Sequence, residues 1–390
     1  MLINQHFDLV IIGGGCAGLS LAYQLSQFGD NCPRTLIIEE RANYTNDRTW
    51  CFWDLEDPIH KDLVPYAWKK FTIKNNHIAH EYSCQETPYL MLPSDIFYEN
   101  ITSAINSNSR IQLLTGEKIV DQVTKEGAWQ IPTSTFTATA TNVVDTRPIK
   151  TMTKKDSLMW QSFAGYEVEL DSPLFNEDQL VLMDFDSSFK EGLAFIYCLP
   201  TSKTTALIEY TVFSEELFVA EQLTNRLVAK ISEYTKNTSY KIVRQEAGIL
   251  PMGNKEIDQK EDPTYLFAGL FAGAARPSSG YAFQRIQTWA KDCALELKNN
   301  HQLKKFKKDS FIQKWMDLLF ITVIKKNPTI GAKVFEELFK NCEAKTVAKF
   351  MSDRSSLLDK LKIVTSLPAI TFLLAIPDLI RIKRRLDRSS

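Results

Sequence analysis

Three glycines near the N-terminus have the spacing of a phosphate-binding turn. Gly13, Gly15 and Gly18 form the pattern G-x-G-x-x-G, and Glu39 follows 21 positions after Gly18. In such a turn the first glycine permits a tight bend, the second lets a pyrophosphate approach the backbone, and the third lets a helix lie close to a strand. The acidic residue accepts hydrogen bonds from a ribose hydroxyl pair. This spacing indicates that the chain binds an adenine dinucleotide.

The flanking sequence predicts the elements that position this turn. Residues 7–12 are a short apolar run typical of a buried strand, residues 19–25 repeat apolar side chains at helical spacing, and residues 35–38 form a second apolar run. We expect the helix to end near Gly29. The free N–H groups at the start of this helix would bind the phosphates. The complete order of strand, turn, helix, strand and acid is much more specific than the glycines alone.

A second glycine-rich element lies far downstream. Residues 265–273 read as an apolar strand that ends in small residues, and a bend then leads into a helix over residues 281–289. Many FAD-dependent enzymes have such an element near the ribityl chain and the flavin ring, so its presence favours FAD over NAD. The residues of this element that we expect to contact the cofactor are Gly269, Gly273, Ser279 and Gly280.

Another predicted strand, residues 142–145, ends in a polar turn. Pro148 disfavours helix at Arg147, which fits a strand that exits into a loop. Asp145 and Arg147 either lie beside the cofactor or pair with each other, and the sequence leaves both alternatives open.

Taken in order, several segments resemble the FAD-dependent lycopene cyclase family, specifically the bacterial lycopene β-cyclases. The resemblance implies an α/β fold with a discontinuous Rossmann-type FAD-binding domain (residues 1–70, 96–155 and 246–300), a β-rich substrate-binding domain (71–95 and 156–245) and a helical C-terminal region (301–390). The segments that carry it are residues 13–18 with Glu39, 49–53, 145–147, 160–167, 182–185, 195–200, 207–211, 248–253 and 276–281.

The resemblance also implies an activity and its residues. Family members are isomerases that close the ψ-end groups of lycopene to β-ionone rings, giving γ-carotene and β-carotene. The catalytic acid of the family maps to Glu209, and Asp184 and Glu167 are further acids in family-like segments. The family uses FAD in its reduced form, with NAD(P)H as the reductant and no net redox change. Protonation of an alkene requires a carboxylic acid held in a dry pocket.

The residues themselves leave alternatives open. Leu207, Glu209 and Thr211 share one strand face, so Glu209 alone also fits an outward-facing carboxylate. Asp184 and Glu167 either assist proton transfer or belong to a buried hydrogen-bond network. The same fold also serves flavin-dependent monooxygenases and prenyl reductases that act on lipophilic substrates, and a non-catalytic carotenoid-binding flavoprotein is a third alternative.

Composition excludes several other classes. Lys and Arg number 46 against 47 Asp and Glu, a balance that argues against a nucleic-acid binder. The seven cysteines are scattered and form no C-x-x-C pair, which predicts reduced thiols and no metal site. The first apolar run lacks the charged start and cleavage pattern of a signal peptide, so we expect a cytoplasmic protein.

The last ninety residues differ in character. Residues 363–377 contain no charged side chain, and a basic cluster follows in the last ten residues (Arg381, Lys383, Arg384, Arg385 and Arg388). This run is shorter than the roughly 20 residues of a spanning helix and contains Pro368 and Pro377. We therefore expect no membrane span. An apolar segment beside basic residues favours attachment to the inner face of the cell membrane, and a packed helical cap with a solvated basic tail is the alternative.

Overall fold

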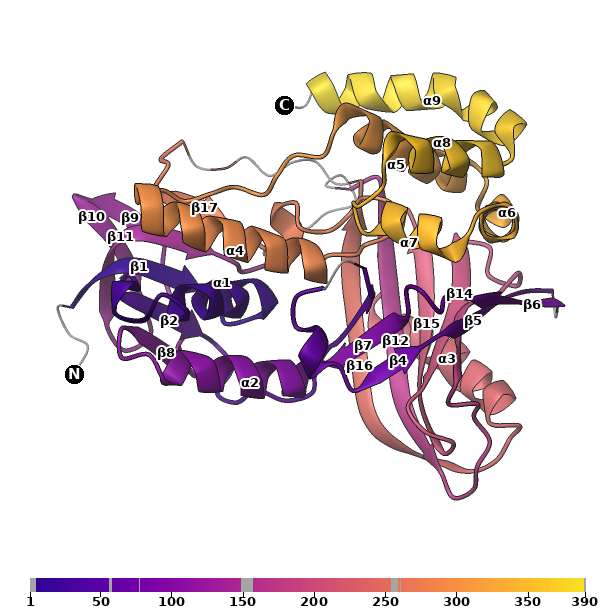
Figure 1. Cartoon of the computed structure of the whole chain (residues 1–390), viewed down its shortest axis with the longest axis horizontal. Coiled ribbons are helices and arrows are strands. Elements are labelled where there is room, and N and C mark those ends of the chain that lie inside the picture. The colour runs from indigo at the N-terminus through magenta and orange to yellow at the C-terminus, as the bar shows by residue number, and fades with distance from the viewer. Residues whose placement is uncertain are drawn as a thin grey trace.

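The computed structural model describes residues 5–55, 58–76, 78–148, 157–253, 259 and 261–388, apart from the side chains of Phe271 and of residues 384–388. Two large sheets stand side by side, and a group of helices caps the second sheet near the C-terminus (Figure 1). Short 3-10 turns interrupt the chain at η1 (Gly29–Asn31), η2 (Lys61–Leu63), η3 (Leu270–Ala272) and η4 (Pro328–Ile330).

The first sheet is built around five parallel strands. Strand β1 lies between β2 and β11, β8 pairs with β2, and β17 pairs with β11. The antiparallel strands β10 and β9 extend this sheet beyond β11. The strands are β1 (His6–Ile12), β2 (Thr35–Glu39), β8 (Ile111–Thr115), β9 (Thr124–Glu126), β10 (Ala128–Pro132), β11 (Thr137–Asp145) and β17 (Tyr265–Phe267).

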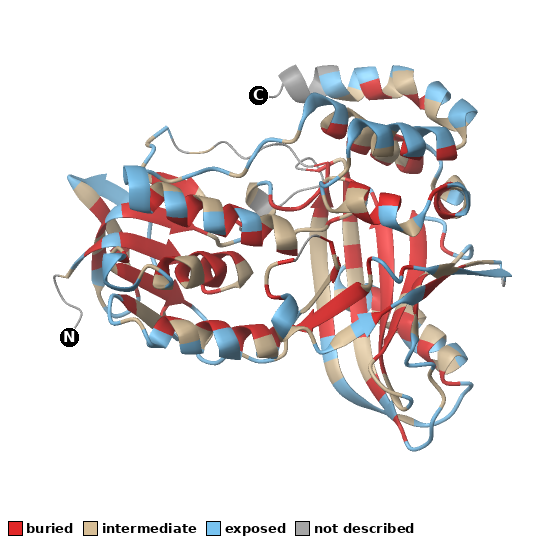
Figure 2. Cartoon of the chain, in the orientation of Figure 1, coloured by how far each residue is buried: buried red, intermediate tan, exposed pale blue. Residues whose placement is uncertain are grey.

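Helices cover one face of this sheet. Leu9, Ile11 and Ile37 point toward α1 (Cys16–Ser26), α2 (Ser94–Asn106) and α4 (Phe283–Asn300), while the alternate residues of the same strands pack against Trp129 and Ile131 of β10. The parallel strands are therefore buried on both sides, which explains their continuous apolar runs (Figure 2). Helix α1 ends at Gln27 rather than near Gly29, which instead begins the turn η1 with a φ of 55°.

The second sheet has the order β16-β12-β15-β14-β13-β5-β6. Its neighbours pair antiparallel except β13 and β5, which run parallel. Residues 193–200 and 206–212 read as two strands around a short polar turn and predict a hairpin, which the antiparallel pairing of β14 with β15 confirms. The strands are β5 (Lys70–Asn75), β6 (Ile78–Ser83), β12 (Met159–Leu170), β13 (Gln179–Phe185), β14 (Leu193–Pro200), β15 (Thr205–Ser214) and β16 (Tyr240–Met252).

Both faces of the second sheet are covered. Helix α3 (Ala220–Tyr234) packs on one face against alternate residues such as Ile208, Tyr210 and Val212. Leu207 and Phe213 point to the other face, where they join a core with the C-terminal helices and a small sheet. That small sheet has the order β3-β7-β4 and consists of β3 (Thr49–Trp53), β4 (Tyr66–Trp68) and β7 (Tyr89–Pro93).

The expected domain division differs from these sheets in two places. Residues 246–252, which we grouped with the FAD-binding domain, pair with β12 of the second sheet, because β16 continues without interruption through Met252. Strand β7, which we grouped with the substrate-binding domain, joins the small sheet and pairs with β3 and β4. All five residues of β7 are buried, so this strand packs between the two large sheets.

The chain continues after α4 with the helices of the C-terminal region. They are α5 (Phe311–Lys326), α6 (Gly331–Asn341), α7 (Ala344–Met351), α8 (Leu357–Ser366) and α9 (Ala369–Arg388). In the part of the chain that the structure describes, no one helix has both the length and the apolar composition for crossing a membrane. Helices α8 and α9 meet those criteria only as a pair, which is bent by 107° between them.

Candidate active site at the junction of the two sheets

A cavity of about 900 Å³ lies between the two large sheets. The carboxyl ends of β1, β2 and β11 line one part, and the inner face of the second sheet lines another. Phe335 of α6 and Met351 of α7, two of the C-terminal helices, also line the cavity. Ligands of open parallel sheets bind outside the carboxyl ends of the strands, and this cavity lies at that place.

The glycine turn borders the cavity as its spacing predicts. Gly13 has a φ of 98°, and a Cβ atom there would lie 2.5 Å from Thr146 Oγ1. Gly15 is the N-cap of α1 and has open space where a side chain would project. Gly18 does not line the cavity, but a Cβ atom at this position would lie 2.0 Å from the carbonyl oxygen of Gly13. The backbone at the start of α1 is therefore free to receive phosphates.

Glu39 closes the same end of the cavity. One carboxylate oxygen accepts the backbone N–H of Gly14 at 2.7 Å, and the other accepts the backbone N–H of Arg41 at 2.8 Å. Burial disfavours ionisation of Glu39, but the hydrogen bonds from Arg41 and Gly14 outweigh it and hold the pKa of Glu39 below its ordinary value. The ionised carboxylate lines the cavity and can accept ribose hydroxyls. Arg41 also lines it, a residue that the fingerprint gave no reason to select.

Asp145 and Arg147 pair with each other. The guanidinium of Arg147 donates to both oxygens of Asp145, at 2.7 and 3.0 Å, and Tyr265 Oη donates to Asp145 at 2.7 Å. Asp145 is buried, whereas Arg147 lines the cavity. Arg147 therefore both pairs with Asp145 and borders the cavity, whereas Asp145 does not line the cavity.

The downstream glycine-rich element reaches the cavity from the opposite side of α1. Gly269, Ser279 and Gly280 line it, and both glycines have positive φ, 93° and 71°. Gly273 is exposed and lies away from the cavity, because the turn η3 carries the chain outward after Gly269. Its φ of 97° gives this glycine a backbone role in the turn instead of the expected contact with a cofactor.

Glu209 lies on the inner face of the second sheet. Its strand β15 is central, and Leu207, Glu209 and Thr211 all line the cavity, so the carboxyl group does not face bulk water. Thr211 Oγ1 donates a hydrogen bond to Glu209 at 2.8 Å. Burial, followed by repulsion from Glu246, raises the pKa of Glu209 to about 8. At neutral pH this side chain is therefore a buried carboxylic acid.

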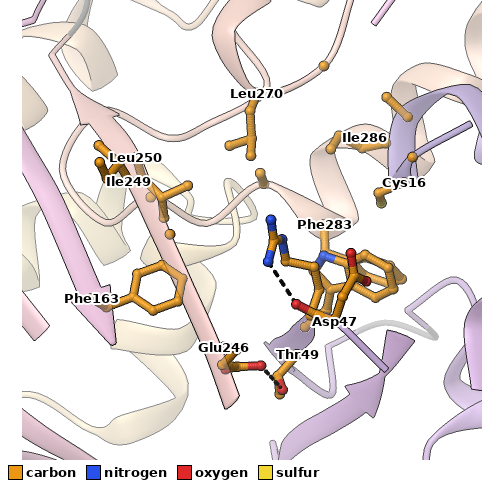
Figure 3. Close-up of a pocket in the computed structure, with 18 of the residues that line it drawn as sticks. Cys16, Asp47, Thr49, Phe163, Glu246, Ile249, Leu250, Leu270, Phe283 and Ile286 are labelled. Atoms are coloured by element: carbon orange, nitrogen blue, oxygen red, sulfur yellow. Dashed lines mark hydrogen bonds between the residues drawn. The ribbon is translucent and has the colours of Figure 1, made fainter. Parts of the chain in front are cut away.

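Sequence reasoning missed the second acid of this site. Glu246 of β16 lines the cavity and accepts a hydrogen bond from Thr49 Oγ1 at 2.8 Å (Figure 3). Arg244, two positions earlier on the same strand face, is its ionic partner. The sequence signal for Glu246 was the i, i+2 pair of opposite charges that it forms with Arg244, in a strand that continues as an apolar run. Nothing in the sequence spacing, however, indicated that β16 lies close to β15.

The other two predicted acids lie elsewhere. Asp184 accepts the phenolic proton of Tyr234 on α3 at 2.7 Å, because an irregularity in β13 turns Asp184 to the α3 face of the sheet. Glu167 accepts Arg244 Nε at 2.9 Å. Neither acid lines the cavity, and both belong to hydrogen-bond networks. Of the three predicted acids, only Glu209 faces the cavity.

Aromatic rings dominate the lining around Glu209. Phe163 projects from β12 beside Glu246, and Phe283 lies at the start of α4 (Figure 3). Trp53 and Trp160, which lie in the family-like segments 49–53 and 160–167, are buried in the structure and do not line the cavity. The aromatic side chains that do are Trp50, Tyr89, Tyr98, Phe163, Phe195, Tyr197, Phe213, Tyr281, Phe283 and Phe335.

The fold and this cavity place the chain in the class of FAD-dependent oxidoreductase and monooxygenase folds. A geranylgeranyl bacteriochlorophyll reductase-like protein from Thermoplasma acidophilum superimposes with a TM-score of 0.62 at 13% identity, over 98% of this chain and 99% of that chain. Aklavinone-11 hydroxylase, solved with FAD and aklavinone, gives a TM-score of 0.57 at 13% identity, over 76% of this chain and 63% of that chain. The predicted fold class is confirmed.

The family follows from the sequence match. The chain belongs to the lycopene cyclase protein family, which it matches over residues 8–376. It is 24% identical to a lycopene beta-cyclase from Pseudescherichia vulneris, covering 93% of this chain and 94% of that protein. The resemblance stated from the sequence is confirmed at the level of the family.

The raised pKa of Glu209 predicts a pH-dependent stability. Between the ordinary carboxyl pKa and about 8, the folded state holds a proton on Glu209 that the unfolded state has lost. The free energy of unfolding of the apoprotein should therefore fall as pH rises through this interval, by up to about 1.4 kcal/mol per pH unit, and level off above it. Glu209→Gln should remove this slope in urea unfolding experiments. Glu169→Gln, an exposed change on β12, should keep it; equal slopes in Glu209→Gln and wild type would contradict the assignment.

Proposed function

We propose that the protein is a lycopene β-cyclase that closes ψ-end groups to β-ionone rings by acid-initiated cyclisation, with reduced FAD bound and no net redox change. The observation that carries the proposal is a carboxylic acid, Glu209, held protonated in a cavity lined by aromatic and aliphatic side chains. The cavity is continuous with the glycine turn and Glu39. An uncharged polyene and a dinucleotide cofactor therefore have adjoining surfaces of suitable chemistry.

The residues around Glu209 fit the first proton transfer. The O–H bond of Glu209 breaks as a C–H bond forms at the terminal double bond of the polyene, which leaves a tertiary cation. The neighbouring double bond closes the ring, and a ring proton then leaves to a base. Phe163, Phe195 and Phe213 line the cavity near this acid and offer ring faces that stabilise a cation. Because these side chains exclude water, the cation is not captured as an alcohol.

The end of the cavity beside the glycine turn and Glu39 suits an FAD cofactor. Gly13, Gly15 and the start of α1 would hold the pyrophosphate, Glu39 the ribose, and Gly269 and Gly280 the opposite side of an extended cofactor. When bound in its reduced, anionic form, the flavin supplies a negative charge that stabilises a nearby cation. NAD(P)H serves as the external source of electrons. A net-redox alternative, a monooxygenase or prenyl reductase, would consume at least one NADPH per product, so stoichiometry separates the two reactions.

The first prediction concerns the cofactor. Gly15→Val should abolish flavin binding, because the isopropyl group occupies the space above the start of α1 that is now open. The purified variant should lack the yellow flavin absorbance of the wild type. Ala79→Val, an exposed change on the strand β6, serves as the control and should retain flavin. Full flavin occupancy in Gly15→Val would overturn the assignment of the phosphate site.

The second prediction concerns the acid. Glu209→Gln should bind FAD and lycopene but lose cyclisation by at least about 10²-fold, as is typical for loss of a general acid. In the wild type, cyclisation should decline as pH rises past about 8, where Glu209 ionises. The assay should use chemically reduced flavin and pigment separation by chromatography. Near-normal β-carotene formation by Glu209→Gln would assign proton donation to another group.

We also propose that the enzyme docks on an anionic bilayer, from which it takes its lipophilic substrate. Seven apolar side chains on α8 and α9 are 52–75% exposed, and we call them the α8–α9 apolar surface: Leu357, Leu358, Leu361, Val364, Ile370, Leu373 and Leu374. Lys362, Arg381 and Lys383 are exposed on the same two helices, whereas the side chains of Arg384, Arg385 and Arg388 lie outside the described residues. Apolar side chains flanked by cations suit an anionic bilayer surface.

The position of this surface supports the same proposal. Helices α6 and α7 pack against α8, and Phe335 and Met351 of α6 and α7 line the cavity. A polyene that leaves the bilayer at α8 would therefore meet apolar side chains throughout its path. The inner face of the cell membrane is the side that we propose, because scattered cysteines without a C-x-x-C pair are typical of a reducing compartment.

The third prediction concerns this surface. The triple change Leu357→Ser, Leu358→Ser and Ile370→Ser should release the protein from anionic vesicles in a flotation assay, and high salt should weaken wild-type attachment by screening. The control is Ile78→Ser, Val219→Ser and Val243→Ser, which removes three exposed apolar side chains outside the α8–α9 apolar surface. Equal partitioning of the two triple variants would count decisively against the α8–α9 apolar surface.

A further inference from the structure

Two carboxyl groups face each other across a position that has no side chain. Glu209 of β15 and Glu246 of β16 are both in register with Gly165 of the intervening strand β12. Residues directly opposite in antiparallel strands project from the same face, so both carboxyl groups lie on the cavity face. A Cβ atom at residue 165 would lie 3.3 Å from Cβ and Cγ of Glu209. The missing side chain leaves the space in which the two acids approach.

Of the two carboxyl groups, Glu246 is the one that has an ion-pair partner among the described residues. Arg244 forms an ion pair with Glu246, and its Nη2 donates at 2.9 Å to Thr49 Oγ1, which in turn donates to Glu246. Glu167 accepts Arg244 Nε and fixes the guanidinium from the other side. The side chain of Glu246 is 3% exposed and that of Arg244 is 11% exposed. A negative charge on Glu246 is therefore compensated within the protein.

Glu246 and, more weakly, the guanidinium of Arg244 act on Glu209 electrostatically, and its other neighbours are uncharged. Thr211 donates to it, Tyr197 is opposite it on β14, and Cys51 of β3 lies within electrostatic range. Burial raises the pKa of Cys51 and of Tyr197 far above neutrality, so neither carries a charge there. Arg48 also lines the cavity, but its guanidinium donates to the carbonyl oxygen of Ala247 at 3.3 Å.

We infer that Glu246 is a positioning residue that makes the pair hold a single proton and places that proton on Glu209. This inference rests on the proposed cyclisation for its purpose, but the one-proton pair is a property of the protein without substrate. Two adjacent buried carboxylates repel each other, so one proton remains between them. Because Arg244 compensates Glu246, the proton resides on the carboxyl group that points to the apolar cavity.

The pair accounts for both proton movements of a cyclisation. Glu209 delivers its proton to the double bond, which leaves two carboxylates side by side. Their repulsion strengthens proton affinity, so Glu209 takes back the proton that leaves the ring as the new double bond forms. The O–H bond of Glu209 breaks and re-forms, one C–H bond forms at the protonated carbon and a different C–H bond of the ring breaks, and the pair returns to its starting charge. Glu246 therefore keeps Glu209 protonated before the reaction and helps Glu209 to regain its proton afterwards. Glu246 does not make Glu209 a stronger acid.

The test is an infrared titration of the flavin-bound full chain without substrate. The C=O stretch of a protonated carboxyl group should disappear with a midpoint near pH 8, and its absence in Glu209→Gln identifies the group. Glu246→Gln removes the neighbouring charge and keeps the shape, so the midpoint should fall by about one pH unit or more. The alkaline limb of the cyclisation profile, measured with reduced flavin, should move to lower pH by the same amount.

Two further variants complete the test. Glu246→Asp keeps a partner for Arg244 and draws the carboxylate back, so its midpoint should lie between wild type and Glu246→Gln; it also serves if Glu246→Gln fails to fold. Glu169→Gln, an exposed change on β12, should leave the midpoint unchanged. An unchanged midpoint in the Glu246 variants would overturn the inference. If the midpoint shifts while Glu209→Gln still cyclises lycopene, the pair stands and the proposed role of Glu209 fails.

Discussion

The burial of two carboxyl groups on one covered sheet face is the constraint on which the site depends. The second sheet is covered by α3 on one side and by the small sheet and C-terminal helices on the other, and Glu209 and Glu246 on its inner face are buried. In a protein interior two like charges about 4 Å apart repel by roughly 4 kcal/mol. With one guanidinium, Arg244, at the pair, the site accommodates one negative charge and one neutral acid.

The same cavity contains a carboxyl group of the opposite character. Glu39 is surrounded by backbone N–H groups and Arg41, which favour its charge, whereas Glu209 is surrounded by apolar side chains and another acid. Environment, rather than residue type, therefore assigns the two roles. A polar end suited to sugar and phosphate adjoins an apolar end suited to a neutral acid, and residues of the small sheet line the same cavity.

Sequence patterns predicted the parts whose spacing is local. The G-x-G-x-x-G turn, its strand and helix, the β14–β15 hairpin and the apolar strands all depend on neighbours within a few residues. Glu209 was mapped through a family motif, but its burial did not follow from the alternation of β15, because both faces of that strand are covered. Glu246 was missed because its proximity to Glu209 depends on the register of two strands with β12, a long-range property. Asp184 was misplaced because an irregularity in β13 reverses the side-chain alternation there.

The interleaved order of the strands has a consequence for how the chain matures on the ribosome. Strand β1 acquires its partner β11 only when Thr139 has emerged to meet His6, and β5 waits for Gln179 to meet Lys70. The edge strand β17 of the first sheet is made after β16 has completed the second sheet's edge. Neither sheet is an autonomous N-terminal unit that folds first while the other is synthesised. The nascent chain therefore presents unpaired strand edges for much of its synthesis, and long-range strand pairing of this kind is expected to slow folding.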